Sequence, residues 1–589
     1  MRDTWRGHME FLYGAERAST AGAGLDRLVE EHLGALERED PSGANRGEGP
    51  PGGAGAAGEL TEKDMMLIAY GDQVTVAGEP PLRTLETFAR SQLKEIVSAI
   101  HVLPFYPYSS DDGFSVIDYK AVDPRLGDWE DVRRLASEFD LMFDAVFNHV
   151  SARSAWFEGF LRDDPVFRDF FVTVEGEPDL SRVARPRVSP LVTPFATAAG
   201  RRRVWTTFSA DQVDLDVRNP EVLLALLDVL LFYVRRGARF IRLDAIAFLW
   251  KEIGTSCIHL PQTHRIIQLM RAVLDEVAPG VRLITETNVP HRDNVSYFGD
   301  GTNEAQLVYN FALPPLVLHA MSEGNAEVLT RWAEELEVPS PRVAFFNFLA
   351  SHDGIGLNPA RGILSEKEIA KLAERAVRHG GYVSNKSNPD GSRSPYELNV
   401  TWLDALSDPA AEPESVRVDR LVVSHAILLS LAGVPGIYFH SLVGSGNDRA
   451  GTEESGMPRR INRERLGLAG LMSELGEAGH LRQRVFERLA GWMRLRRSEP
   501  AFHPAAGQRI LRVDSRVFGL MRTAVGGGER VVCLHNVSGE RVVVWLPDEA
   551  LAGAASIVEL RRGTGVGRRV LAGAEVELEP YGILWARLE

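Results

Sequence analysis

From residue 64 onward, apolar strand-like runs alternate with helical patterns, and this alternation constrains the fold more than any other feature. Helical patterns such as 129–139, 220–234 and 263–277 lie between the runs. Eight repeats of a strand followed by a helix predict a closed (β/α)8 TIM barrel of the α/β class. The eight expected strands are MMLIAY (65–70), AIHVLPF (99–105), LMFDAVFN (141–148), RFIRLDA (239–245), VRLITET (281–287), QLVYNFAL (306–313), RVAFFNFL (342–349) and GVPGIYFH (433–440).

The spacing between these runs is uneven. About ninety residues separate the third run from the fourth, and about eighty separate the seventh from the eighth. A single helix does not need that length, so we expect a barrel over 61–504 with inserted subdomains at 150–218 and 354–415. After about residue 505 the pattern changes to short alternating strands, which predicts a C-terminal antiparallel β domain over 505–589.

The first part of the chain, residues 1–60, is predicted to be an N-terminal extension. Apolar residues recur at helical spacing over 24–38, which predicts a short amphipathic helix. In the segment 41–58, ten of eighteen residues are Gly or Pro. Such a composition does not form a packed element, so we expect a flexible or disordered linker there.

Composition excludes several classes of partner. The formal net charge of -15 disfavours a protein that grips phosphate backbones, so no nucleic acid partner is expected. The cysteines, Cys257 and Cys533, are too few for a disulfide framework and indicate a reducing compartment. The longest apolar run, 222–234, is shorter than a membrane span and is interrupted by Asp228. We therefore expect a cytoplasmic protein that does not bind a membrane.

One of the expected strands carries two full charges. Arg242 and Asp244 lie two residues apart in the run 239–245, so both side chains leave the strand on the same face. Burying an isolated charge costs several kcal/mol, so buried charges are normally paired or exposed to a ligand. The pattern indicates either an ion pair or a functional site.

Polar residues end four of the expected strands, and catalytic groups of (β/α)8 barrels collect at such ends. Each has a structural alternative: a salt bridge, an exposed strand terminus, a capped core histidine or a turn residue. Their joint placement favours a catalytic site. The residues are Asp144, Asn148 and His149 in the third run, Arg242 and Asp244 in the fourth, Glu286 in the fifth, and Ser351, His352, Asp353 and Gly354 after the seventh.

These segments resemble a known family. In chain order, DAVFNH (144–149), RFIRLDA (239–245), ITET (284–287) and FLASHD (348–353) are similar to the four conserved regions of the α-amylase superfamily, glycoside hydrolase family 13. The resemblance narrows to the sucrose-phosphorylase branch through the segments 101–119, 250–264 and 311–320. Within that branch it is greatest to the glucosylglycerate phosphorylases, through 285–301, 346–362 and 394–407, and it covers roughly residues 60–589.

The resemblance implies a set of catalytic carboxylates. Asp244 would be the nucleophile and Glu286 the acid/base, about 5 to 5.5 Å apart as in retaining glycosyl transfer. Arg242 would hold Asp244 ionised by lowering its pKa, whereas Glu286 has to stay protonated until the leaving oxygen departs. Asp353 would be the third carboxylate, which holds sugar hydroxyls as the ring flattens.

The resemblance also implies a glucose pocket and an acceptor site. His149 and His352 would donate hydrogen bonds to glucose, Asp111 would hold its far side, and Phe114 would be an aromatic platform. On the acceptor side, an anionic acceptor or phosphate needs cations. The candidates in MPRRINRERL are Arg459, Arg460 and Arg463, with a solvated basic helix start as the alternative.

Two further residues bear on the acceptor. Tyr396 and Glu397 lie where sucrose phosphorylases carry Tyr and Gln, and this difference counts against sucrose. A carboxylate near an anionic acceptor is unfavourable unless an arginine neutralises it. The sequence leaves this question open.

The implied activity is the reversible phosphorolysis of 2-O-α-glucosylglycerate to α-D-glucose 1-phosphate and D-glycerate, by double displacement. The alternatives are sucrose phosphorylase, glucosylglycerol phosphorylase and a non-catalytic amylase-like binding protein. No metal or cofactor is expected, and inorganic phosphate would be the co-substrate. The expected partners are therefore a small sugar glycoside and phosphate, with a homodimer left open.

Overall fold

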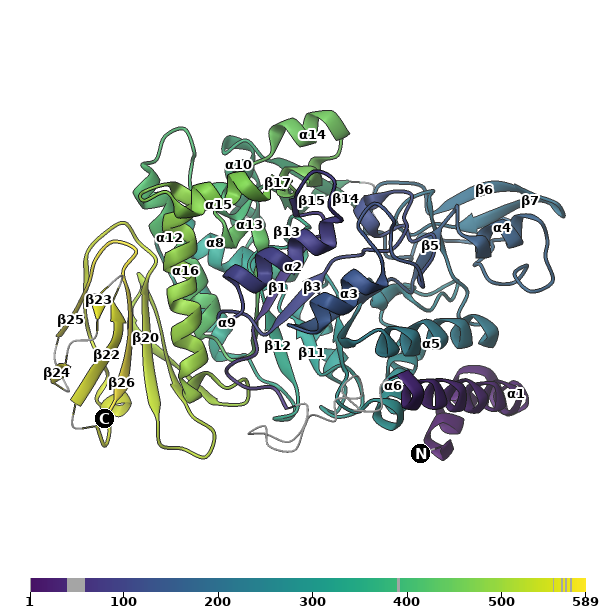
Figure 1. The fold of residues 1–589 in the computed structure, drawn as a ribbon, viewed down its shortest axis with the longest axis horizontal. Helices are drawn as coiled ribbons and strands as arrows, with labels where there is room; N and C mark the ends of the chain where they lie inside the picture. Colours follow the sequence, from purple (N-terminus) through teal and green to yellow (C-terminus); the bar gives the residue numbers. More distant parts are fainter. Residues whose placement is uncertain are drawn as a thin grey trace.

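A computed structural model describes residues 2–39, 59–388, 392–554, 556–562, 565–566, 569–571 and 575–589 (Figure 1). The segment 41–58, predicted to be a flexible linker, lies outside the described residues.

The centre of the molecule is a closed barrel of eight parallel strands (Figure 1). Neighbouring strands follow the order β1-β16-β12-β11-β10-β9-β4-β3. Each strand overlaps one of the eight expected runs, so the predicted (β/α)8 barrel is confirmed. The strands are β1 (Met66–Ala69), β3 (Ala99–Val102), β4 (Asp140–Ala145), β9 (Ala238–Leu243), β10 (Arg282–Thr285), β11 (Leu307–Tyr309), β12 (Ala344–Asn347) and β16 (Val434–Tyr438).

Helices surround the barrel and begin where the local sequence supplies a start signal. Asp128 precedes α3 and forms a capping box with Asp131, while the Asn219 side chain accepts a hydrogen bond from the Glu221 amide at the start of α5. The surrounding helices include α2 (Pro81–Gln92), α3 (Trp129–Ala136), α5 (Pro220–Arg235), α6 (Pro261–Val277), α8 (Leu313–Glu323), α9 (Glu327–Glu334), α12 (Glu414–Ser430) and α16 (Leu481–Ser498).

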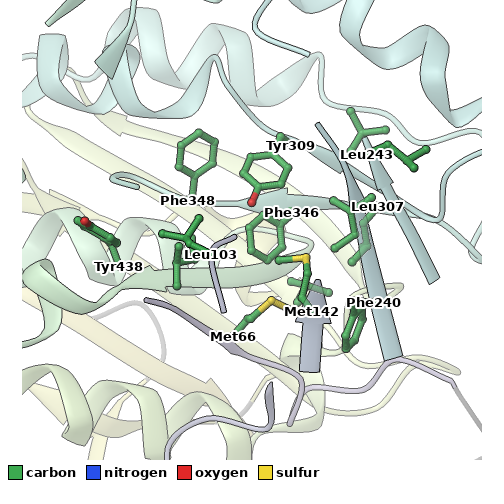
Figure 2. Close-up of a cluster of buried hydrophobic side chains, with 14 of the residues drawn as sticks. Met66, Leu103, Met142, Phe240, Leu243, Leu307, Tyr309, Phe346, Phe348 and Tyr438 are labelled. Carbon is green, nitrogen blue, oxygen red and sulfur yellow. The ribbon is translucent and has the colours of Figure 1, made fainter. Parts of the chain in front are cut away.

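Large apolar side chains form the packed core of the barrel (Figure 2). Phe346 lies against Tyr309, with ring centroids 4.7 Å apart, and both are buried. Gly436 leaves room for this packing, because a Cβ at that position would come within 2.3 Å of the Phe346 ring. The side chains therefore close the barrel below its C-terminal rim and leave no pore.

The long gap between β4 and β9 contains strands of its own. β5 (His149–Ser151) pairs with β8 (Gln212–Asp214), and β6 (Val192–Thr197) pairs with β7 (Gly200–Trp205). A short helix, α4 (Ala155–Leu161), lies between β5 and β6. The boundaries 150–218 for this insertion remain a prediction.

The gap between β12 and β16 holds an antiparallel sheet in the order β13-β15-β14. The boundaries 354–415 of this insertion also remain a prediction. Its elements are β13 (Ile355–Gly356), α10 (Glu366–Arg378), β14 (Tyr382–Ser387), β15 (Arg393–Asn399) and α11 (Trp402–Leu406).

The C-terminal part is antiparallel β structure, as predicted (Figure 1). A fully buried arginine joins it to the barrel: Arg522 of β19 donates to the carbonyl oxygen of Ser430 at the end of α12. The strands include β18 (Gly507–Asp514), β19 (Val517–Thr523), β20 (Arg530–Asn536), β26 (Ile583–Leu588) and β22 (Ser556–Arg562), with β21 (Val542–Trp545) paired to β25 (Glu575–Leu578).

The N-terminal helix is longer than expected. α1 runs from Arg2 to Glu39 with a break at Gly14 (φ 74°), whereas the spacing predicted only 24–38. The prediction was too short because Trp5 and Met9, on the other side of the break, continue the buried apolar face. α1 lies beside α5 and α6 (Figure 1), and the Tyr13 hydroxyl donates to the Val217 carbonyl at 2.8 Å.

Candidate active site

The strand register brings Asp244 and Glu286 to neighbouring positions. Leu243 of β9 is paired with Thr285 of β10, and the two carboxylates follow directly at the C-terminal ends. Adjacent strands lie about 4.8 Å apart. The Ala245 amide donates to Glu286 Oε2 at 3.1 Å, so the Glu286 carboxylate lies beside the backbone that carries Asp244.

Arg242 forms ion pairs with two aspartates, although it does not itself line the cavity. Its Nη1 lies 2.9 Å from Asp244 Oδ1 and 2.5 Å from Asp144 Oδ1. Asp144 is also bound by His101 Nε2, 2.7 Å from Oδ2. Arg242 is 2% exposed, so these ion pairs are buried. The ion pair that the charged strand predicted is therefore present, and the functional role of these two residues stays a prediction.

Arg242 lowers the pKa of Asp244, as expected, but this effect is too small to keep that pKa low. Burial raises the pKa of Asp244 well above its usual range, and the carboxylates of Glu286, Asp144 and Asp353 raise it further against the opposing effect of Arg242. The guanidinium of Arg242 also pairs with Asp144, and it does not offset the effect of burial on the pKa of Asp244. Burial also raises the pKa of Glu286. Asp244 and Glu286 together therefore retain a proton more readily than two separate carboxyl groups would.

Asp353 has the opposite electrostatic environment. Its Oδ1 lies 2.8 Å from Arg459 Nη1, and its Oδ2 lies 3.4 Å from His352 Nε2. Burial alone would raise the pKa of Asp353, but Arg459, His352 and Arg242 outweigh burial and lower it. Asp353 is therefore ionised at neutral pH.

Phe114 and His352 form a stacked pair of rings. Their centroids are 4.7 Å apart and their planes differ by 9°. Burial lowers the pKa of His352 to about 4, so the imidazole is neutral at pH 7. His149 donates from Nε2 to the Phe114 carbonyl at 2.9 Å, which connects the start of β5 to this pair.

A cavity of about 1210 Å³ opens over these residues. The structure brings most of the predicted site residues together in its lining: Asp111, Phe114, His149, Asp244, Glu286, His352, Asp353, Tyr396, Glu397 and Arg459. The cavity is somewhat larger than the about 300 to 1,000 Å³ that is usual for small-molecule pockets, so it has room for a small glycoside.

Arg459 neutralises Glu397, the carboxylate that the sequence left unexplained. Arg459 donates from Nε to Oε1 at 3.0 Å and from Nη2 to Oε2 at 2.7 Å. Two parallel bonds of this kind fix both side chains. Because Glu397 is 1% exposed and fully paired, it does not present a free negative charge to an acceptor.

The structure does not place Arg460 and Arg463 in the cavity lining. Arg463 Nη1 lies 2.5 Å from Asp112 Oδ1, and Arg463 also pairs with Asp72 at 3.2 Å. Arg460 lies 3.5 Å from Asp112. Neighbouring carboxylates occupy both guanidinium groups, so the geometry gives no support to their predicted role in substrate binding. The alternative of a solvated helix start fails too, since Arg463 is buried.

The sequence interpretation missed several cations in the cavity lining. A usable signal was the run RVARPR (182–187), which places three arginines within six residues of the first insertion. Arg187 is held over the ring of Tyr396, 5.7 Å from its centroid, and has no recorded ion pair within the described part of the chain. Apart from Arg459, the cations that line the cavity are Arg182, Arg185, Arg187, Arg203 and Lys386.

The described residues show neither a metal-binding cluster nor a membrane-spanning helix. They contain no group of three or more His, Cys, Asp or Glu side chains that could hold a metal ion. Within the same residues, none of the helices has the length and apolar character needed to cross a membrane.

The barrel and its rim of carboxylates define a class of protein, the enzymes with the α-amylase fold. A family model described as "Alpha amylase, catalytic domain" matches residues 92–354. The crystal structure of sucrose 6F-phosphate phosphorylase from Thermoanaerobacter thermosaccharolyticum superposes with a TM-score of 0.72 at 24% identity, over 88% of this chain and 99% of that chain. This likeness shows the same fold.

Sequence relatives narrow the class. The chain is 52% identical over 541 residues to the glucosylglycerate phosphorylase of Allomeiothermus silvanus, which covers 91% of this chain and 93% of that protein. It is 31% identical to the sucrose phosphorylase of Agrobacterium vitis, over 75% of this chain and 89% of that protein. The chain is an enzyme that belongs to the glucosylglycerate phosphorylase family of the α-amylase superfamily.

Proposed function

We propose that the protein is a retaining α-glucoside phosphorylase that converts 2-O-α-glucosylglycerate and phosphate reversibly into α-D-glucose 1-phosphate and D-glycerate. The resemblance to glucosylglycerate phosphorylase over 91% of the chain supports this substrate. The single structural observation that carries the proposal is the mixed lining of the cavity. Carboxylates from the barrel strands line the same space as cations such as Arg187, which forms no ion pair within the described residues.

The first half-reaction transfers glucose to the enzyme. The pair of Asp244 and Glu286 reacts with its proton on Glu286 and with Asp244 ionised. Asp244 attacks the anomeric carbon, the bond from that carbon to the glycerate oxygen breaks, and Glu286 gives its proton to the departing oxygen. The raised pKa of Glu286 supports the acid role, because its proton is retained until the leaving group needs it. Asp353, ionised beside Arg459, binds sugar hydroxyls as positive charge develops on the ring.

The second half-reaction releases the product. A phosphate oxygen attacks the anomeric carbon, the ester bond to Asp244 breaks, and Glu286 takes the proton from phosphate. Two inversions give retention, so α-glucose 1-phosphate is formed. Phosphate and glycerate are both anions, and Arg187 and Lys386 supply the positive charge that either one needs.

The test is an incubation of the enzyme with glucosylglycerate, with and without phosphate. We expect α-glucose 1-phosphate and D-glycerate only when phosphate is present. Free glucose released at the same rate without phosphate would instead identify a hydrolase. A protein without chemistry would leave the glucosylglycerate intact in both incubations.

The acceptor is tested in the synthetic direction. With α-glucose 1-phosphate as donor, D-glycerate should be used in preference to glycerol and to fructose. A preference for fructose would identify a sucrose phosphorylase, and a preference for glycerol a glucosylglycerol phosphorylase.

The place of the reaction is proposed to be the cytoplasm, because both cysteines are free and buried.

A further inference from the structure

The loop that carries two of the glucose-pocket residues has an unusual backbone. Asp111 (φ 53°), Asp112 (φ 50°) and Gly113 (φ 114°) are three consecutive residues in the left-handed region. Residues other than Gly rarely adopt this conformation, and it persists only where the surroundings hold it. Gly113 also approaches the Pro104 carbonyl so closely that a Cβ would lie 2.8 Å from the oxygen. The loop therefore needs external anchors.

Asp211 is one such anchor. Its Oδ2 accepts hydrogen bonds from three serine hydroxyls on both sides of the loop: Ser109 at 2.5 Å, Ser110 at 2.5 Å and Ser115 at 2.8 Å. The Ser115 hydroxyl also reaches the Asp211 carbonyl at 3.1 Å. A single oxygen that accepts three hydroxyl protons needs the negative charge of a carboxylate, because an amide would bring N–H donors of its own.

The residue after Asp211 acts on the same loop from inside the cavity. Gln212 Nε2 donates to Asp111 Oδ2 at 3.1 Å and to the Phe114 carbonyl at 3.3 Å. Gln212 begins β8, which pairs with β5 and hence with His149. Asp211 itself does not line the cavity, so it can act on a sugar only through the loop.

We propose that Asp211 is a positioning residue for glucosyl transfer: by binding the hydroxyls of Ser109, Ser110 and Ser115, it fixes Asp111 and Phe114 at the glucose pocket. The inference rests on the proposed function, because it assumes that glucose occupies this pocket. It assigns a specific role to the first insertion, which supplies Asp211 just before β8 and so couples its own fold to sugar binding.

The test compares kcat/KM for the glucosyl donor with kcat/KM for phosphate. The kcat/KM for the donor (the donor value) covers the reaction from free enzyme to glucosyl-enzyme. The kcat/KM for phosphate (the phosphate value) covers the reaction that starts from the glucosyl-enzyme. For Asp211→Ala we expect the donor value, with glucosylglycerate and with α-glucose 1-phosphate, to fall by about tenfold or more. The phosphate value should change by less than about threefold. Asp169→Asn, an exposed site in the same insertion, is the matched control and should equal the wild type.

Two sets of combined variants separate a positioning role from a general effect on stability. The triple variant Ser109→Ala, Ser110→Ala, Ser115→Ala should reproduce the donor defect of Asp211→Ala, and adding Asp211→Ala to it should cause little further loss. In an Asp111→Ala background, Asp211→Ala should likewise have a reduced effect. Additive losses in these combinations would overturn the inference.

A purely structural role gives a different pattern. In that case Asp211→Ala lowers the melting temperature and reduces the donor and phosphate values by the same factor, and this result overturns the inference. An unchanged donor value in a folded Asp211→Ala protein also overturns it. Failure of the proposed function is distinguishable, because the wild type itself then forms no α-glucose 1-phosphate from glucosylglycerate.

Discussion

Arg459 lies between Glu397 and Asp353 and makes ion pairs with both, through Nη2 at 2.7 Å and Nη1 at 2.8 Å. One guanidinium therefore fixes a carboxylate of β15 and a carboxylate that follows β12. The pairing explains how a glutamate can stand beside an anionic acceptor. It also keeps Asp353 ionised, since Arg459 is the strongest of the groups that lower the pKa of Asp353.

Loss of this guanidinium should affect stability and activity together. Arg459→Met leaves Glu397 buried without a partner, and breaking a buried pair costs about 3 kcal/mol. We expect a lower melting temperature and at least a hundredfold loss of kcat, measured by calorimetry and by phosphate-dependent turnover. Adding Glu397→Gln should recover much of the stability but not the activity. No recovery in the double variant would contradict the ion-pair explanation.

The nucleophile assignment can be tested by chemical rescue. Asp244→Ala should lower kcat by about 10⁴-fold, because the covalent step is lost. The deletion leaves space for a small anion beside the anomeric carbon. With α-glucose 1-phosphate as donor, azide should then restore turnover and give β-glucosyl azide, identified by NMR. An α-glucosyl azide would instead indicate that Asp244 acts as the acid/base.

Glu286 should destabilise the fold at neutral pH. Its pKa is raised by burial, so its contribution to stability is complete below the unfolded pKa of about 4.3 and is lost as the pH rises through the folded pKa. Glu286→Gln stays neutral and should raise the melting temperature at pH 7 by about 1 to 2 °C. The gain should vanish near pH 4. A gain that does not change with pH would argue against a raised pKa.

Asp353 should show the opposite dependence. Its pKa is lowered in the folded protein, so its contribution to stability is present above the unfolded pKa of about 3.9 and is lost as the pH falls. Asp353→Asn should therefore lower the melting temperature at pH 7, and the difference should shrink toward pH 3. Thermal melts of both variants over the same pH series give the comparison.

Arg187 should favour anions on the acceptor side. Arg187→Met removes a cation that is held over the Tyr396 ring in the cavity. We expect the KM values for phosphate and for D-glycerate to rise by about tenfold, the usual effect of losing one charge-assisted contact. The KM for glycerol, a neutral acceptor of similar size, should stay within about twofold. Equal losses for glycerol and glycerate would contradict an electrostatic role.

The barrel core offers a test of packing. Gly436→Ala places a Cβ within 2.3 Å of the Phe346 ring and should cost about 1 to 3 kcal/mol of stability. Phe346→Leu alone should also destabilise, because it leaves unfilled volume. The double variant should be more stable than the sum of the two losses predicts, as measured by chemical denaturation. Strict additivity would show that the two positions do not compete for space.

The amino-acid sequence by itself determined the barrel and the positions of its carboxylates. Apolar runs such as 281–287 are local signals, and a charged residue that ends one has to lie at the C-terminal rim once the barrel closes. For that reason Asp244, Glu286 and Asp353 could be predicted together. The full length of α1 could not be predicted in the same way, because the break at Gly14 interrupts the helical spacing of the apolar face.

Only the tertiary structure decided the partners of the charged groups. Arg459, Arg460 and Arg463 are similar in sequence, yet Arg459 alone lines the cavity and the other two pair with Asp112. In the sequence, Glu397 lies 62 residues from Arg459, and Asp112 lies hundreds of residues from Arg460 and Arg463. No local pattern encodes such contacts. The pKa of Asp244 was decided in the same way, because burial and charges from four strands act on it at once. Local sequence specifies strands and their ends, whereas electrostatics depends on which ends meet.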